Sequence, residues 1–346
     1  MIEQFKQRIL QGKPLCIRGA GSKDFYGNAA QGEVLDTRAH CGIVAYEPTE
    51  LYVTAKCGTP LAEIEAVLAG QGQFLAFEPP RFAPDSTVGG AVAAGLSGPR
   101  RVSAGALRDF VLGVKLLDGA ARELTFGGQV MKNVAGYDVS RVIAGSLGTL
   151  GMITEVSLKV LPTQVADATL RFVMAQAAAL DQLNRWAGRP LPIVASVWDA
   201  GVLTIRLAGA RAAVEAAQQK VGAGETADAA LWDALRDQTA DFFKAETLWR
   251  LSVPSTAPEL RLPGEQLIEW GGALRWLKSD APAETIRTAA AAVGGSATLY
   301  RAPAELKAQV GAFAPLPAPL MTLHKNLKSA FDPQGIFNPG RLYKEF

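Results

Sequence analysis

Short apolar runs broken by glycine, proline and charge characterise the first part of the chain. The runs at 43–46 and 51–55 have the length of buried strands and are bounded by turn-forming residues. Two further strand-like runs within 111–126 flank Asp118-Gly119, and this arrangement predicts a hairpin. Clean alternation over 152–160 predicts another strand. The pattern therefore predicts a strand-rich first domain.

One helix is also predicted in this part of the chain. Thr59-Pro60 has the form of an N-cap followed by proline at the first helical position. Apolar residues follow at helical spacing, and Gly70 supplies a stop.

The pattern changes after residue 165, where glycine motifs become rarer and alanine-rich helical stretches appear. Two rounds of strand–helix–strand–strand–helix predict an antiparallel sheet with helices on one face. The helical stretches lie near 175–187, 210–220, 228–243 and 283–292, and the strand-like runs lie near 168–174, 193–198, 202–207, 246–253, 266–277 and 297–300.

The predicted fold class is therefore α+β. Prolines between 315 and 319 mark a linker, and a short helix is predicted over 321–331. We expect a first domain at 1–163, a second domain at 164–320 and a C-terminal segment at 321–346.

Composition narrows the classes of function. Hydrophobic residues make up 49% and charged residues 20% of 346 residues, as in a globular protein. The formal charge of +2 is too close to neutral to indicate a nucleic-acid-binding protein. The three cysteines have no CxxC spacing and the two histidines form no ligand set, so we expect no metal site. No signal-peptide-like start or membrane-spanning run is present, which favours a cytoplasmic location.

The first candidate binding motif is Arg18-Gly19-Ala20-Gly21-Ser22, directly after a strand-like run at 14–17. Small residues in series let backbone N–H groups face a phosphate, and the Arg18 and Ser22 side chains add donors. A Rossmann fingerprint fails here because its third glycine falls at Asp24. The alternative is an ordinary turn.

Two further motifs are rich in glycine. Thr87-Val88-Gly89-Gly90 runs on to Gly95 and then to Arg100-Arg101, and its bare backbone can lie against a flat ring. The other motif begins at Lys132-Asn133 and continues in the glycine-rich segment Gly145–Ile153, which includes Gly151 and Ile153. For the motif that begins at Thr87, the alternative is a tight helix–loop junction that needs small residues. For the motif that begins at Lys132, the alternative is a surface loop.

These motifs, in this order, resemble the FAD-binding domain of the vanillyl-alcohol-oxidase, or p-cresol-methylhydroxylase (PCMH)-type, superfamily. Phe331-Asp332-Pro333-Gln334-Gly335-Ile336-Phe337-Asn338-Pro339-Gly340 resembles the closing segment of its glycolate and D-lactate branch. Gly98-Pro99-Arg100-Arg101 and Val130–Asp138 are similar to the FAD-binding subunits of bacterial glycolate oxidases. The resemblance covers about the first 163 residues and the tail.

The resemblance implies a flavin domain of two α+β subdomains with FAD between them, a cap domain, and a tail that folds back on the flavin domain. Ser22 stands where covalent-flavin members often carry histidine, so we expect non-covalent FAD. The cofactor-binding residues we expect are Arg18, Gly19, Ala20, Gly21, Ser22, Thr87, Gly89, Gly90, Gly95, Arg100, Lys132, Asn133, Gly151 and Ile153.

Two residues are candidates for catalysis. Arg275 lies between the two tryptophans of Trp270-Gly271-Gly272-Ala273-Leu274-Arg275-Trp276, where a guanidinium can bind a substrate carboxylate. His324 lies on the predicted helix before the tail and is a candidate base. For the first, the alternative is a hairpin turn at Gly271-Gly272 with packed tryptophans. For the second, it is a structural or solvated histidine.

The expected function is oxidation of a 2-hydroxy acid such as glycolate by the FAD-binding subunit of a glycolate oxidase complex. The chain lacks cluster-ligand cysteines, so an iron–sulfur partner is expected beside a larger homologous FAD subunit, and any contact with the inner face of the membrane is through these partners. One alternative is an electron-transfer or scaffold subunit without its own substrate oxidation. Another is a stand-alone flavin oxidase of a different alcohol.

Overall fold

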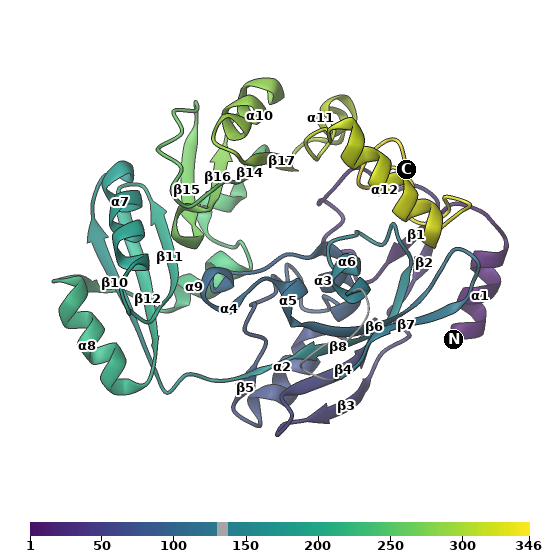
Figure 1. Ribbon diagram of the computed structural model, residues 1–346, viewed down its shortest axis with the longest axis horizontal. Helices are drawn as coiled ribbons and strands as arrows, with labels where there is room; N and C mark the ends of the chain where they lie inside the picture. The colour runs from purple at the N-terminus through teal and green to yellow at the C-terminus, as the bar shows by residue number, and fades with distance from the viewer. Residues whose placement is uncertain (130–137) are drawn as a thin grey trace. The chain divides into compact units, whose positions relative to one another are not determined.

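The computed structural model describes residues 1–129 and 138–346, and the chain divides into two compact units (Figure 1). Unit 1 comprises 1–97, 106–162 and 307–346, and unit 2 comprises 98–105 and 163–306. The predicted boundary near 163 coincides with the end of the second segment of unit 1. Residues 307–320, which we expected in the second domain, lie in unit 1, and 98–105 lie in unit 2.

The main sheet of unit 1 is antiparallel and five-stranded within the described residues. Its order is β3 (Ile43–Glu47), β4 (Tyr52–Lys56), β8 (Met152–Lys159), β6 (Val111–Leu117) and β7 (Glu123–Gly127). The central strand β8 has six of its eight residues buried, so both of its faces are covered. The predicted hairpin is confirmed, because β6 and β7 pair from Gly113–Gly127 to Leu117–Glu123.

A second, smaller layer of unit 1 joins the two ends of the chain. Strands β1 (Leu15–Arg18) and β2 (Glu33–Asp36) are parallel, and Leu15 also forms a parallel bridge with Phe337. Helix α1 (Ile2–Leu10) contributes Phe5 and Ile9 to the same core. The C-terminal tail is therefore part of this layer.

The remaining elements of unit 1 are short. They are α2 (Leu61–Ala69), β5 (Gln73–Phe74), α3 (Val88–Ala94), α5 (Leu107–Phe110), α6 (Val139–Ile143), β9 (Leu161–Pro162), most of α11 (Ala304–Val310) and α12 (Ala318–Phe331). The N-cap prediction for Thr59 is wrong by one residue, because α2 begins at Leu61 and Pro60 caps it. The Thr59 hydroxyl instead donates to the carbonyl of Lys56 (2.7 Å) in the preceding turn.

Unit 2 is built on an eight-stranded antiparallel sheet in its described part. The order is β13 (Glu225–Thr226), β10 (Ala166–Val173), β12 (Val202–Gly209), β11 (Ile193–Asp199), β15 (Glu265–Glu269), β16 (Leu274–Lys278), β14 (Leu248–Ser252) and β17 (Ser296–Arg301). The predicted antiparallel α+β organisation is confirmed. The run at 266–277 is two strands because Trp270–Gly272 forms a short 3-10 turn (η2), with Gly271 and Gly272 at positive φ.

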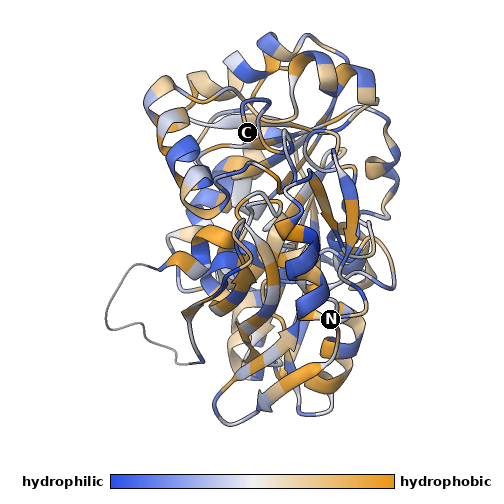
Figure 2. Ribbon diagram, turned by 90° about the vertical axis from the view of Figure 1, so that its right-hand side faces the viewer, coloured by the Kyte–Doolittle hydropathy of each residue, from blue (hydrophilic) through white to orange (hydrophobic). Residues whose placement is uncertain are grey.

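Helices cover this second sheet. Helices α7 (Gln176–Ala187) and α8 (Arg211–Val221) bury Leu183, Trp186 and Val214 in one core with β10 and β12, so they share a face. The other helices are α4 (Arg101–Ala104), α9 (Ala230–Arg236), η1 (Asp241–Lys244) and α10 (Ala283–Ala292). Several helical ribbons carry both blue and orange segments, as expected for amphipathic helices on a sheet (Figure 2). No helix among 1–129 and 138–346 is long and apolar enough to cross a bilayer.

Candidate functional site

The glycine turn after β1 forms one wall of a cavity in unit 1. Residues from Cys16 to Asp24 line this cavity together with Thr87, Gly90 and Leu147. Gly21 has φ +76°, a conformation that glycine adopts without strain. The Arg18 guanidinium donates to the carboxylate of Asp24 (2.6 Å), which holds the arginine over the turn. The predicted motif is therefore a cavity wall and not an ordinary surface turn.

Helix α3 and its N-cap form another part of the cavity wall, with Thr87, Gly90, Ala93 and Ala94 lining it. Thr87 is the N-cap, and its hydroxyl accepts a hydrogen bond from the Gly90 amide (3.3 Å). A Cβ on Gly19 would collide with the Thr87 hydroxyl, and a Cβ on Gly89 would lie 2.6 Å from Cβ of Cys57. Both glycines are required because a side chain at either position would overlap with Thr87 or Cys57.

The loop at 144–151, which we call the glycine loop, closes a second cavity beside the first. Gly145, Leu147 and Gly148 have φ values of +87°, +51° and +71°, so the chain turns tightly here. Gly151 and Ile153 line the second cavity with Gly89 and Cys57. A Cβ on Gly148 would lie 2.7 Å from the side-chain nitrogen of Asn338.

The two cavities adjoin and together make one groove in the described part of unit 1, which we call the glycine groove. They share the residues Ile17, Gly19, Gly90, Ala93, Leu147 and Asn338. The first end of the groove is lined by the cationic residues Arg18, Lys23 and Arg341 and by the carboxylate of Asp24. The second end is lined mainly by glycine and apolar residues.

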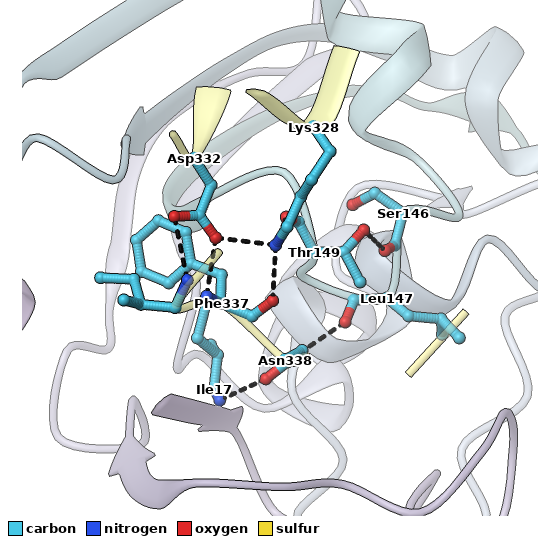
Figure 3. A network of polar contacts seen from close by, with 9 residues as sticks. Ile17, Ser146, Leu147, Thr149, Lys328, Asp332, Phe337 and Asn338 are labelled. Carbon is cyan, nitrogen blue, oxygen red and sulfur yellow. Dashed lines mark hydrogen bonds and ion pairs between the residues drawn. The ribbon is translucent and has the colours of Figure 1, made fainter. Parts of the chain in front are cut away.

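The C-terminal tail forms hydrogen bonds with two segments that line the groove (Figure 3). The Asn338 side chain accepts from the Ile17 amide (2.7 Å) and donates to the Leu147 carbonyl (2.5 Å). The buried Lys328 ammonium donates to the carbonyls of Thr149 (2.7 Å) and Phe337 (2.8 Å) and pairs with Asp332 (2.7 Å). The tail thus contacts both β1 and the glycine loop.

Burial shifts the pKa of several groups around the groove. It raises the pKa of the Cys57 thiol to about 12 and also raises that of Cys16, so both thiols are neutral at physiological pH. Burial lowers the pKa of Lys328, and the adjacent Asp332 carboxylate opposes this effect. It also lowers the pKa of Arg341, whose guanidinium donates to the carbonyls of Asn28 (2.5 Å) and Asp24 (3.0 Å).

Most predicted cofactor residues line the glycine groove. They are Arg18, Gly19, Ala20, Gly21, Ser22, Thr87, Gly89, Gly90, Gly151 and Ile153. Gly95 lines neither cavity: it ends α3 at φ +65° and packs against Gly145. Arg100 lies in unit 2, where its buried guanidinium approaches Asp167 (3.4 Å). Lys132 and Asn133 lie outside the described residues.

The two predicted catalytic residues occupy different surroundings. Arg275 is 1% exposed, and its guanidinium donates to the carbonyls of Ala257 (2.5 Å), Pro258 (2.5 Å) and Gly272 (3.2 Å) within unit 2. His324 is exposed on α12, and its ring contacts Tyr343 edge-on with 5.9 Å between centroids. These contacts favour the structural alternative for both side chains.

Sequence reasoning did not propose several residues that line the groove, among them Lys23, Cys57, Asn338 and Arg341. Asn338 lies within the tail motif that we compared with the glycolate and D-lactate branch, so the motif marked the segment but not the role of this side chain. Lys23 and Arg341 carried no local signal, because their neighbours in space are distant in sequence.

The glycine groove fits an FAD molecule on the observed chemistry. Cβ atoms at Gly19, Gly89 or Gly148 would collide with neighbouring walls, so the chain keeps its backbone bare along the groove. The cationic first end suits a diphosphate, and the second end, lined by Gly89, Gly151 and Ile153, suits a flat ring.

Comparisons with known proteins agree with this fit. Residues 10–127 match the family model of the FAD binding domain. The chain is 49% identical to glycolate oxidase subunit GlcE of Escherichia coli K12 over all of this chain and 97% of that protein. It is 30% identical to glycolate oxidase subunit GlcD of Bacillus subtilis over 45% of this chain and 34% of that protein. The resemblance to the superfamily is thereby confirmed.

A solved structure shows the same fold at low sequence similarity. Alkyldihydroxyacetonephosphate synthase superposes with a TM-score of 0.67 and 17% identity, over 98% of this chain and 74% of that one. The full-length match to GlcE decides the family. The chain belongs to the family of glycolate oxidase subunit GlcE and carries an FAD-binding domain.

Proposed function

We propose that this chain is the FAD-binding subunit of a glycolate oxidase and takes part in oxidising glycolate to glyoxylate. The observation that carries the proposal is the glycine groove, with cationic side chains at one end and bare backbone at the other. Full-length similarity to GlcE supports the reaction class, and the shorter similarity to the D-lactate dehydrogenase of Archaeoglobus fulgidus (29% identity over 45% of this chain) points to the same type of substrate.

In this proposal the residues of the groove divide their roles by position. Arg18, Lys23 and the 19–22 turn would hold the diphosphate, and Gly89, Gly151 and Ile153 would face the flavin ring. Bound FAD would supply the two-electron redox chemistry that converts a hydroxy acid to an oxo acid. The chain itself provides position and charge.

We propose that the flavin is held without a covalent bond. No histidine lines the groove in its described part, and Ser22 occupies the position after the glycine turn. The thiols that line the groove, Cys16 and Cys57, are kept neutral by burial and are therefore poor nucleophiles. Flavin that stays with the polypeptide after acid precipitation would contradict this assignment.

The electrons need an acceptor outside this chain. The sequence has three cysteines, of which Cys16 and Cys57 are buried and unpaired, and a four-cysteine cluster site is therefore impossible. We propose that an iron–sulfur subunit accepts the electrons in a complex with a larger homologous FAD subunit. Any membrane association is proposed to come through these partners.

A second candidate function is an FAD-containing electron-transfer or scaffold subunit, with a homologous subunit oxidising the substrate. The surroundings of Arg275 and His324 favour it. Three backbone carbonyls occupy the Arg275 guanidinium, and His324 is exposed among aromatic rings of the tail.

The decisive experiment is a spectrum of the purified chain with FAD, recorded before and after anaerobic addition of glycolate or D-lactate. Bleaching of the flavin band supports substrate oxidation by this chain. A flavin that stays oxidised with substrate, yet is reduced in the presence of the homologous subunit and substrate, supports the electron-transfer alternative. A chain that takes up no FAD would overturn the proposed function altogether.

A further inference from the structure

The buried Asn338 side chain connects β1 with the loop at 144–151, two segments that line the glycine groove. Asn338 is 5% exposed and lines both cavities. Its carboxamide oxygen accepts from the Ile17 amide on β1, and its nitrogen donates to the Leu147 carbonyl on the glycine loop. Because an amide has one acceptor end and one donor end, it matches this pair of backbone groups, whereas a carboxylate has no donor for Leu147.

The backbone around Asn338 is held tightly enough to direct this side chain. Its φ is +42°, in the left-handed region that asparagine tolerates better than most residues. The Asn338 amide donates to the Leu15 carbonyl (2.9 Å), and the Leu15 amide donates to the Ile336 carbonyl (2.7 Å). The tail therefore runs beside β1 like an added strand, and Asn338 reaches the groove from its end.

A buried ion pair fixes the same segment one step earlier in the chain. The Asp332 carboxylate accepts from the amides of Ile336 (3.1 Å) and Phe337 (2.7 Å) and pairs with Lys328. Lys328 also donates to the Thr149 carbonyl on the glycine loop. The loop is thus joined to the C-terminal segment at Leu147 and at Thr149 (Figure 3), and both hydrogen bonds are buried.

We propose that Asn338 is a positioning residue of the FAD site, which sets the separation of β1 and the glycine loop and links the docking of the tail to cofactor binding. The inference rests on the proposed FAD site. If the walls take their FAD-binding arrangement only when Asn338 bridges them, FAD binding must in turn hold Asn338 and its neighbours in place, because thermodynamic linkage is reciprocal.

The test is FAD titration of apoprotein carrying N338D. This nearly isosteric change keeps an acceptor for Ile17 but places a carboxylate oxygen against the Leu147 carbonyl, so FAD affinity should fall about tenfold or more. Near pH 5 the introduced carboxyl becomes partly protonated and regains a donor, so the loss relative to wild type should shrink compared with that at about pH 8. Equal affinity of N338D and wild type at both pH values would overturn the inference.

Asn28 offers a matched control, because it lies outside the tail but bonds to it at Gly340 and Leu342. Its side chain donates to the carbonyls of Gly340 (2.9 Å) and Leu342 (3.2 Å) and accepts from the Ala312 amide (2.8 Å), but it lines neither cavity. N28A loosens the tail beyond Asn338 and should weaken FAD binding several-fold less than N338D does. Equal losses in the two variants would contradict a specific role for Asn338.

Hydrogen exchange gives a readout that does not depend on activity. In wild type, FAD should slow amide exchange in the tail at 336–342 as well as in the turn at 18–22, and N338D should lose the tail effect. If N338D fails to fold, N338G keeps the left-handed backbone, removes both bonds and should show the same loss of affinity. Wild type that binds no FAD refutes the proposed function, whereas wild type that binds FAD without slower exchange at 336–342 refutes only this inference.

Discussion

Arg341 in unit 1 and Arg275 in unit 2 are both buried, and both donate to backbone carbonyls, yet they shape different features. Arg341 bonds to the chain between Lys23 and Asn28 and lines the groove that this chain helps to form. Arg275 joins Ala257 and Pro258 to the β15–β16 turn. Unit 1 thus uses buried charge to build a groove, whereas unit 2 uses it to fasten a loop to a sheet.

The largest effect on stability is expected at the ion pair behind the groove. K328A leaves the buried Asp332 carboxylate without its counter-ion and removes the donor to Thr149, which should lower the free energy of unfolding by about 3–5 kcal/mol. The matched change in unit 2 is K278A, because Lys278 pairs with a largely exposed Glu265 and lies 4.6 Å from the Phe242 ring centroid, two contacts that together should contribute about 1–2 kcal/mol. Denaturant unfolding of the two variants measures both losses of stability. Similar losses in K328A and K278A would contradict the different roles that we assign to buried charge in unit 1 and surface charge in unit 2.

The next effect concerns the bare backbone of the groove. G89A places a Cβ 2.6 Å from Cβ of Cys57, so α3 must move away from β4's end, at a cost of about 1–3 kcal/mol. The FAD affinity of G89A, measured by fluorescence titration, should also fall, because Gly89 lines the groove. Gly128 has open space around the position of an added Cβ, so G128A is the control and should bind FAD as wild type does.

The two arginines can be separated by substitution. R275A leaves three carbonyls in unit 2 without their hydrogen-bond donor and should reduce the free energy of unfolding by about 1–3 kcal/mol. The Michaelis constant for glycolate should be unchanged in the assembled enzyme. R341A should reduce both stability and FAD affinity, because its carbonyl partners belong to the wall of the groove. A raised Michaelis constant in R275A that is not explained by unfolding would restore the carboxylate-binding role for Arg275.

The smallest effect is a difference among the three thiols. Cys41 is exposed and should react rapidly with a disulfide reagent near neutral pH, while the buried Cys16 and Cys57 should react slowly.

The raised pKa of Cys57 makes stability depend on pH in the alkaline range. Burial raises this pKa from the ordinary thiol value of 9.0 to about 12, so between these pH values the thiol ionises readily only in the unfolded protein, and the folded protein should lose stability as pH rises. C57S should flatten this alkaline loss in unfolding curves measured across that range; an unchanged slope would show that Cys57 is not its source.

The sequence predicted features that depend on near neighbours. The 111–126 hairpin and the Gly271-Gly272 turn were both correct, because the strands that they join are adjacent along the chain. The glycines at 19, 89 and 151 were also recognisable as places where backbone must approach another group. In contrast, Gly95 belongs to the same motif as Gly89 but serves to end a helix, and composition alone does not distinguish these uses.

The residues that sequence reasoning missed depend on distant partners. Asn338 meets Ile17 across 321 positions, and Lys328 meets Thr149 across 179. Lys328 also lies on a helix whose other residues are exposed or half-buried, so its pattern indicates an ordinary solvated lysine. Only the return of the tail to β1 reveals that this lysine is buried.

The bridge between Leu15 and Phe337 has a consequence for how the protein is made. The segment that completes this layer is translated hundreds of residues after the strand that leads into the glycine turn. Unit 2, apart from 98–105, is translated between them and can fold first. The cofactor site should therefore mature only after translation of the tail, and nascent chains that stop before residue 331 should emerge without a complete flavin groove.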